Sequence, residues 1–159
     1  MRASPALSWV GLAVRLIAAG IWLVAGAAKL ADLTSFKQEI AAYDVAPSSL
    51  VDVIAYGLPL LELGLGVYLA VGLLVRPAAL LSVGLMLLFI GVQAQAWARG
   101  LSIQCGCFGS LSRETVGAGS IVRDVALALP SVLLLLRPAR HLSLDQRLLG
   151  RQDAFAAGR

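Results

Sequence analysis

Charge is scarce in this sequence of 159 residues: 14% of the residues are charged, whereas 59% are hydrophobic and the mean hydropathy is +0.86. A soluble domain of this size would expose far more apolar surface than it could bury. The apolar runs also lack the alternation of apolar and polar residues that is typical of strands. Because every backbone polar group in lipid needs an internal partner, the sequence predicts an all-α integral membrane protein.

Histidine and cysteine are rare as well, with one histidine, His141, and two cysteines, Cys105 and Cys107. Two sulfur atoms alone do not complete a zinc or copper(I) site, and the topology given below places His141 on the opposite side of the membrane. Internal repeats and low-complexity tracts are absent too, so residues 1–159 are interpreted as a single domain.

Four apolar runs are long enough, at about 18 residues or more, to cross about 30 Å of hydrocarbon as helices. They predict a four-helix bundle with spans at about 7–30, 53–75, 77–97 and 119–136, followed by a cytoplasmic tail at 137–159. A competing interpretation takes the first run as a cleaved signal peptide, because Arg2 precedes it and small residues occupy 25–28. Arg15 inside the apolar stretch and Lys29 directly after the small residues favour a membrane span.

The basic residues beside the spans predict the orientation of the chain. They are Arg2, Arg76, Arg137, Arg140, Arg147 and Arg151. The positive-inside rule places them, with both termini, on the cytoplasmic side of a bacterial inner membrane, and places loops 31–52 and 98–118 outside. A basic fringe attracted to anionic membrane lipid explains the sequence pI of about 9.6 without any nucleic acid.

The first outer loop contains apolar residues at helical spacing, behind Thr34 and Ser35. These residues are Leu33, Phe36, Ile40 and Tyr43. The spacing predicts a short amphipathic helix that lies on the membrane and ends near Pro47, with an ordinary ordered loop as the alternative.

Cys105, Gly106 and Cys107 form a closely spaced pair of thiols on the second outer loop, where the compartment is oxidising. A disulfide that closes so short a loop constrains the unfolded chain very little, so its stabilising effect should be small. Gly106 supplies the backbone freedom that closure needs, and a strained bridge is easily reduced by a partner thiol. The pattern therefore favours a redox-active pair. Soft-metal ligation and unreactive thiols remain the alternatives.

Charged residues within the spans are a second candidate feature. Arg15, Trp22 and Lys29 are spaced by sevens, which places them within about 40 degrees of one stripe on the first span. Glu62 follows Pro59 in the second span, at a depth between those of Arg15 and Lys29, so either cation is within reach of it. Buried charges are costly unless they are paired or face a wet cavity.

Arg123 and Asp124 lie about one turn into the fourth span. The positions along the spans place three features near the same outer face of the membrane: Arg123, Lys29 and the cysteine loop. Cations there would favour the thiolate form of a cysteine over the thiol. We therefore interpret Arg15, Lys29, Glu62, Arg123 and Asp124 as a supporting charge network. The alternative is snorkelling of the long cationic side chains together with a purely structural ion pair.

The order of these features along the chain resembles the MauE branch of the DoxX-like membrane proteins. The matching residues are Arg15, Gly26 with Lys29, Tyr43 with Pro47, Leu58-Pro59 with Glu62 and Gly66, Arg99-Gly100, Cys105-Gly106-Cys107-Phe108-Gly109 and Arg123-Asp124. The resemblance implies a four-helix membrane protein of redox processes that works with a thioredoxin-like partner in maturing a disulfide-rich periplasmic subunit of methylamine dehydrogenase. It also implies a redox role for Cys105 and Cys107, but no established role for Lys29, Glu62 or Arg123.

The first hypothesis is a membrane thiol-disulfide oxidoreductase component whose Cys105–Cys107 pair exchanges electrons with an extracytoplasmic thioredoxin-like protein. Analogy with other four-helix disulfide-generating proteins adds a membrane quinone held between the helices, a step that rests on architecture alone. The second hypothesis is a non-catalytic membrane scaffold that docks a soluble redox enzyme and uses the two cysteines structurally or for a metal.

Overall fold

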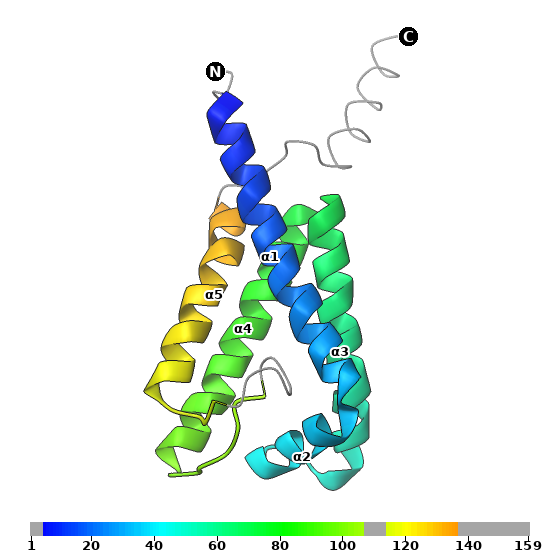
Figure 1. Ribbon diagram of the computed structural model, residues 1–159, viewed down its shortest axis with the longest axis vertical. Helices are drawn as coiled ribbons and strands as arrows, with labels where there is room; N and C mark the ends of the chain where they lie inside the picture. Colours follow the sequence, from blue (N-terminus) through cyan, green and yellow to red (C-terminus); the bar gives the residue numbers. More distant parts are fainter. Residues whose placement is uncertain (1–4, 107–113, 137–159) are drawn as a thin grey trace.

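The computed structural model describes residues 5–106 and 114–136 of the chain (Figure 1). Within these ranges it contains five α-helices and no strand. The helices are α1 (Pro5–Ala31), α2 (Leu33–Tyr43), α3 (Ser48–Val71), α4 (Val75–Ala98) and α5 (Ala118–Leu136). Cys107 and the predicted tail at 137–159, with His141, lie outside the described residues.

Four of these helices are long and apolar enough to cross a membrane, namely Trp9–Ala31 of α1 and the whole of α3, α4 and α5. The all-α four-span fold predicted from the sequence is therefore confirmed, and the chain is a multi-pass membrane protein. Large hydrophobic side chains stay exposed along the outer faces of the helices, for example Leu60 and Leu80 at 60% each. Such faces are expected of helices whose surroundings are lipid.

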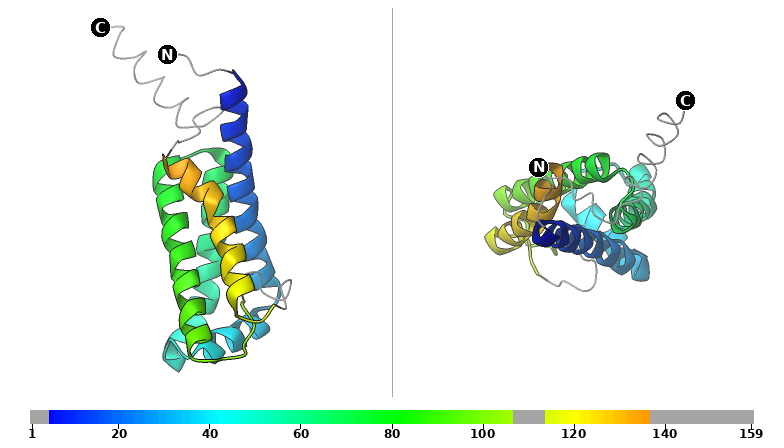
Figure 2. Two further views of the ribbon diagram at one scale, coloured as in Figure 1. Left: turned by 90° about the vertical axis from the view of Figure 1, so that its left-hand side faces the viewer. Right: turned by 90° about the horizontal axis from the view of Figure 1, so that it is seen from above.

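The four long helices run side by side, and α2 lies across one end of the bundle (Figures 1 and 2). α1 packs chiefly against α3 and also against α5, which in turn packs against α4. α1 begins and α5 ends at the end of the bundle opposite to α2. The segment that contains Cys105 lies at the α2 end.

The predicted limits of the second span were wrong by several residues, because local capping sets them. α3 already begins at Ser48, directly after the extended Pro47, although Asp52 follows in its second turn. It ends at Val71 because Gly72 adopts a left-handed conformation with φ 74°. The N–H of Gly72 donates to the carbonyl of Tyr68, and so does the next N–H. This arrangement is a glycine C-cap, which terminates the helix before the expected boundary.

α1 and α3 approach each other closely through two glycines. A Cβ atom on Gly26 would lie 2.8 Å from the carbonyl oxygen of Pro59, and one on Gly66 would lie 2.6 Å from Cγ of Leu23. Small residues at membrane helix interfaces permit this close backbone approach, which increases van der Waals contact. The contact fixes the position of Lys29 on α1 relative to Glu62 on α3.

The face of α1 that points into the bundle carries the predicted stripe. Arg15, Trp22 and Lys29 are exposed by 2%, 1% and 1%, so all three are buried as expected. Trp22 packs in the main apolar core, where its ring centroid lies 6.4 Å from that of Phe89 on α4.

The amphipathic helix predicted in loop 31–52 is present as α2. Its N-cap is Asp32, whose side chain accepts hydrogen bonds from the backbone N–H and the hydroxyl of Ser35, at 3.1 and 2.7 Å. The helix ends at Tyr43, a few residues before the predicted end near Pro47, because its C-cap Asp44 is left-handed with φ 51°. Its buried face packs on the bundle, chiefly against α3.

Candidate functional site

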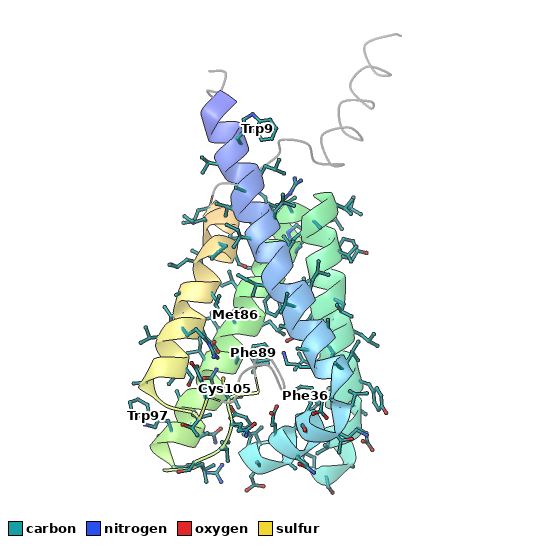
Figure 3. The ribbon with its side chains drawn as sticks, in the orientation of Figure 1. Trp9, Phe36, Met86, Phe89, Trp97 and Cys105 are labelled. Atoms are coloured by element: carbon teal, nitrogen blue, oxygen red, sulfur yellow. The ribbon has the colours of Figure 1, made fainter. Side chains whose placement is uncertain are left out.

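Two hydrogen bonds fix the backbone of Cys105. Its N–H donates to the carbonyl of Glu114 at 2.9 Å, and Gln104 forms an antiparallel bridge with Thr115. The hydroxyl of Tyr43 on α2 donates to the carbonyl of Cys105 at 2.8 Å. Cys105 is only 4% exposed. These contacts hold its sulfur at the α2 end of the bundle, as Figure 3 shows.

Arg123 on α5 is the cation beside this sulfur. Its Nη2 donates to Sγ of Cys105 at 3.2 Å, while its Nη1 donates to the carboxylate of Glu114 at 2.7 Å. Nε and Nη2 both donate to Oδ1 of Asp124 at 3.0 Å. Asp124 is 1% exposed and also accepts a hydrogen bond from Nε2 of Gln93 at 2.5 Å. The guanidinium is therefore clamped in place by two carboxylates and faces the sulfur.

Of the two cations predicted to lie within reach of Glu62, Lys29 is the one that pairs with it. Nζ of Lys29 donates to both carboxylate oxygens of Glu62, at 2.6 and 2.8 Å, and the two side chains are 1% and 0% exposed. The same ammonium group lies 5.6 Å from the ring centroid of Phe36 and 5.3 Å from that of Phe89. Arg15 lies about 21 Å along α1 from Lys29. The structure thus places Arg15 in the other half of the bundle, away from Cys105.

Glu39 on α2 is a site residue that the sequence reasoning missed. Its side chain is 9% exposed, and within the described part of the chain its Oε2 has no hydrogen-bond partner. Burial raises the pKa of this carboxyl, and the positive charge of Lys29 opposes the shift. The available signal was its position three residues after Phe36 and four before Tyr43, which places it on the apolar face of α2.

Gly106 lies directly against this carboxyl group. It adopts a positive φ of 70°, and a Cβ atom there would stand 2.6 Å from Oε2 of Glu39. Both the conformation and the close approach require glycine at this position. Gly106 therefore brings the backbone next to Cys105 onto Glu39.

A cavity of about 400 Å³ lies between α2, α3, α4 and the cysteine loop. Apolar side chains form most of its wall: Phe36, Ile40, Tyr43, Val45, Ala46, Ile54, Leu58, Leu88, Phe89 and Val92. Glu39, Gln93 and Gln95 add polar groups, and Cys105 and Gly106 border it. Figure 3 shows Phe36, Phe89 and Cys105 at this end of the bundle. Gln93 connects the cavity wall to Asp124, and through Asp124 to Arg123.

The family model of the methylamine utilisation protein MauE matches residues 7–137. The chain belongs to the MauE family. Comparison with curated proteins and with solved structures gives no match. The MauE match extends from α1 to the end of α5, so it covers Cys105 and all the residues that contact it. The predicted resemblance to MauE is therefore confirmed.

The metal alternative rests on Cys105 and Cys107 together. Among residues 5–106 and 114–136, no three His, Cys, Asp or Glu side chains form a group that could hold a metal ion. Cys107 lies outside these ranges, so the alternative stays a prediction from the sequence. Within the described ranges, Sγ of Cys105 lies at hydrogen-bond distance from the guanidinium of Arg123, and the carbonyl of Cys105 accepts a hydrogen bond from Tyr43.

Proposed function

We propose that this MauE-family protein exchanges disulfides with a thioredoxin-like protein at the outer face of the bacterial inner membrane, through Cys105 and Cys107. The observation that carries the proposal is the 3.2 Å contact between Nη2 of Arg123 and Sγ of Cys105. A fixed positive charge stabilises thiolate relative to thiol, and the thiolate is the form that takes part in disulfide exchange. The positive-inside rule supports the outer location of the pair and the cytoplasmic location of both termini.

The burial of Cys105 assigns different roles to the two cysteines. A sulfur atom on a residue that is 4% exposed gives a protein partner no approach, so we assign contact with the partner to Cys107. A partner thiolate attacks Sγ of Cys107 in the Cys105–Cys107 disulfide, and the sulfur–sulfur bond breaks. Cys105 leaves as a thiolate beside Arg123. Because a stabilised thiolate leaves faster, the guanidinium accelerates this step.

The second half of the exchange releases the partner from its mixed disulfide with Cys107. The partner's other thiolate attacks its own sulfur in the mixed disulfide and expels Cys107 as a thiolate. The partner has then lost two electrons and gained a disulfide, while Cys105 and Cys107 have gained two electrons and, after protonation, are thiols. The same steps run in reverse when the partner is the oxidised protein.

Asp124 and Gln93 act as positioning residues in this scheme. Asp124 binds two nitrogen atoms of Arg123 and is itself held by Gln93 from α4. Glu114 binds Nη1 from the outer side at 2.7 Å. The two carboxylates of Asp124 and Glu114 have two effects on Arg123. They offset part of the guanidinium charge, and they fix the guanidinium beside Cys105, which is the main effect.

The family description connects MauE with methylamine utilisation. We propose on this basis that the thioredoxin-like partner forms disulfides in an exported protein of that pathway. The Cys pair would supply the oxidising equivalents, and the partner would select the final substrate.

Single-cysteine variants test the proposal and the two roles. Cys105→Ser leaves Cys107 and should trap a mixed disulfide with the partner, which mass spectrometry of the adduct identifies. Cys107→Ser leaves the buried Cys105 and should trap little or none. Equal trapping by both variants would contradict the assigned roles. A partner that binds normally to the double variant, with no adduct formed by either single variant, would support the scaffold hypothesis instead.

A further inference from the structure

We propose that the cavity beside Cys105 binds the headgroup of a membrane quinone, which accepts the electrons of the Cys105–Cys107 dithiol, and that Glu39 passes a proton to it. This inference rests on the proposed function and extends it by naming the electron acceptor and its site. The architecture alone suggests a quinone only by analogy. The argument here rests on the cavity, its opening and the buried carboxyl group.

The size and wall of the cavity fit a quinone headgroup. Its volume of about 400 Å³ falls within the range of about 300–1,000 Å³ that is typical of small-molecule sites. Aromatic rings of Phe36, Tyr43 and Phe89 contribute to an otherwise aliphatic wall. Such a wall favours a flat apolar ring over a charged or strongly hydrated substrate.

The cavity opens where a lipid-soluble molecule can enter. Leu88 on α4 lines the cavity and is also 58% exposed on the outside of the bundle. Ile54 and Leu58 on α3 line it from the neighbouring membrane-spanning helix. A headgroup can therefore enter between α3 and α4 while its isoprenoid tail stays in the bilayer.

Glu39 supplies the polar group that orients a quinone. Its side chain is nine-tenths buried, lines the cavity and leaves Oε2 without a hydrogen-bond partner in the described part of the chain. An unsatisfied buried polar atom is costly, so a ligand that accepts a hydrogen bond from the protonated carboxyl would stabilise the site. The charged groups that act on Glu39 are Lys29, which is paired with Glu62, and Asp32. A quinone carbonyl is an acceptor of the required kind.

The redox step balances with these groups. Cys105 and Cys107 lose two electrons and two protons and form one sulfur–sulfur bond. The two electrons and two protons convert the two carbonyls of the quinone into the hydroxyls of a quinol. Glu39 gives its proton to one oxygen and regains a proton that the thiols release. The direction agrees with a periplasm that is kept oxidising by transfer of electrons from thiols to quinone.

The test uses the full-length protein in detergent and decylubiquinone as the quinone. The reduced protein is mixed anaerobically with the quinone, quinol is measured by absorbance, and the disulfide is measured by the alkylation mass shift. We expect one quinol for each Cys105–Cys107 disulfide formed. Leu88→Trp should fill the mouth of the cavity and weaken quinone binding about tenfold or more. Leu87→Trp is the matched control, because Leu87 is 62% exposed on the same helix and does not line the cavity.

Glu39→Gln tests the proton step separately. Its amide keeps a hydrogen-bond donor, so quinone binding should be retained, but quinol formation should slow at least about tenfold. Exchange of the cysteine pair with a thioredoxin, measured without quinone, should be unchanged in Leu88→Trp and Leu87→Trp.

The outcomes separate this inference from the proposed function. Wild-type protein that exchanges disulfides with thioredoxin but neither binds nor reduces decylubiquinone would overturn the inference alone. Equal quinone binding by Leu88→Trp and Leu87→Trp would exclude the cavity as the site and would also overturn it. Wild-type protein that binds the quinone at this cavity but exchanges no disulfide would overturn the proposed function, and with it the electron transfer inferred here.

Discussion

Lys29 and Glu62 form an ion pair in the interior of the bundle, with Nζ 2.6 and 2.8 Å from the two carboxylate oxygens. Neither side chain is more than 1% exposed. The rings of Phe36 and Phe89 complete the surroundings of the ammonium group. Removing one member of such a pair leaves an uncompensated buried charge, so the pair makes the packing of α1 on α3 sensitive to single substitutions.

Glu62→Ala should lower the free energy of unfolding by about 3–5 kcal/mol, the range typical of breaking a buried pair. Glu62→Gln should have a smaller effect, because the amide still accepts a hydrogen bond from Lys29. Unfolding in detergent, followed by circular dichroism, measures both. The control is Asp52→Ala, which breaks the exposed pair of Lys37 and Asp52 and should change stability little. Equal losses for Glu62→Ala and Asp52→Ala would contradict the prediction.

The close approach of α1 and α3 gives a second prediction. Gly66→Ala should destabilise the protein, because the new Cβ would stand 2.6 Å from Cγ and 3.0 Å from the backbone nitrogen of Leu23. Gly64→Ala is the matched control on the same helix, since nothing lies within 4 Å of its Cβ. Both changes raise helix propensity by about 1 kcal/mol, so the difference between their unfolding midpoints isolates the packing term. Identical midpoints would show that α1 and α3 adjust freely.

The fold was predictable because its strongest signals are local. Long apolar runs specify the spans, and the Arg15, Trp22 and Lys29 spacing on α1 specifies which face is buried. Depth along two helices left Arg15 and Lys29 as candidate partners of Glu62, and the structure pairs Glu62 with Lys29. The limits of α3 did not follow, because Pro47 and the left-handed Gly72 set them through backbone geometry rather than hydropathy.

The candidate site was predictable only in part, because it is assembled from segments far apart in the sequence. The depth of Arg123 suggested a cation near Cys105, and the two are in contact. Glu39 was missed because its burial depends on how α2 folds across the end of the bundle. Gln93 was missed because a neutral amide in an apolar span gives no signal until Asp124 is placed beside it.

Orientation gives a third prediction. In a variant without Cys105 and Cys107, a reporter cysteine at the exposed Ser102 should react with a membrane-impermeant thiol reagent on intact cells. A reporter at the exposed Arg76, at the opposite end of the bundle, should react only after the membrane is permeabilised. These positions avoid the buried Cys105, whose own labelling would be slow on either side. The reverse labelling pattern would place the cysteine loop in the cytoplasm.

Arg123→Gln should make the Cys105–Cys107 disulfide harder to reduce, because the neutral amide no longer stabilises the Cys105 thiolate that reduction releases. We expect the midpoint potential to fall by roughly 30 mV or more, which corresponds to a tenfold change in the equilibrium constant. A redox titration read by alkylation mass shift measures it. Lys37→Gln removes a positive charge from the surface pair with Asp52 and should leave the midpoint unchanged. A shift common to both variants would point to net charge rather than to Arg123.

Glu39 should make stability depend on pH in a direction opposite to that of Asp32. Burial raises the pKa of Glu39 above its ordinary value of 4.5, so the folded state keeps a proton that the unfolded chain loses. The contribution of Glu39 to stability is therefore greatest below pH 4.5 and is lost as the pH rises through the raised pKa. Hydrogen bonds from Ser35 lower the pKa of Asp32, so its contribution is lost as the pH falls.

The measurement is the unfolding midpoint in detergent between about pH 3 and about pH 8, a range that covers the titration of ordinary carboxyl groups. Relative to wild type, Glu39→Gln should gain stability as the pH rises, because the amide has no proton to lose. Asp32→Asn should be less stable than wild type at the upper end of the range, and this deficit should shrink as the pH falls through the lowered pKa of Asp32, because wild type then loses the same contribution. A difference between wild type and Glu39→Gln that does not change with pH would show that Glu39 is not held protonated by burial, and would remove the proton donor from the cavity beside Cys105.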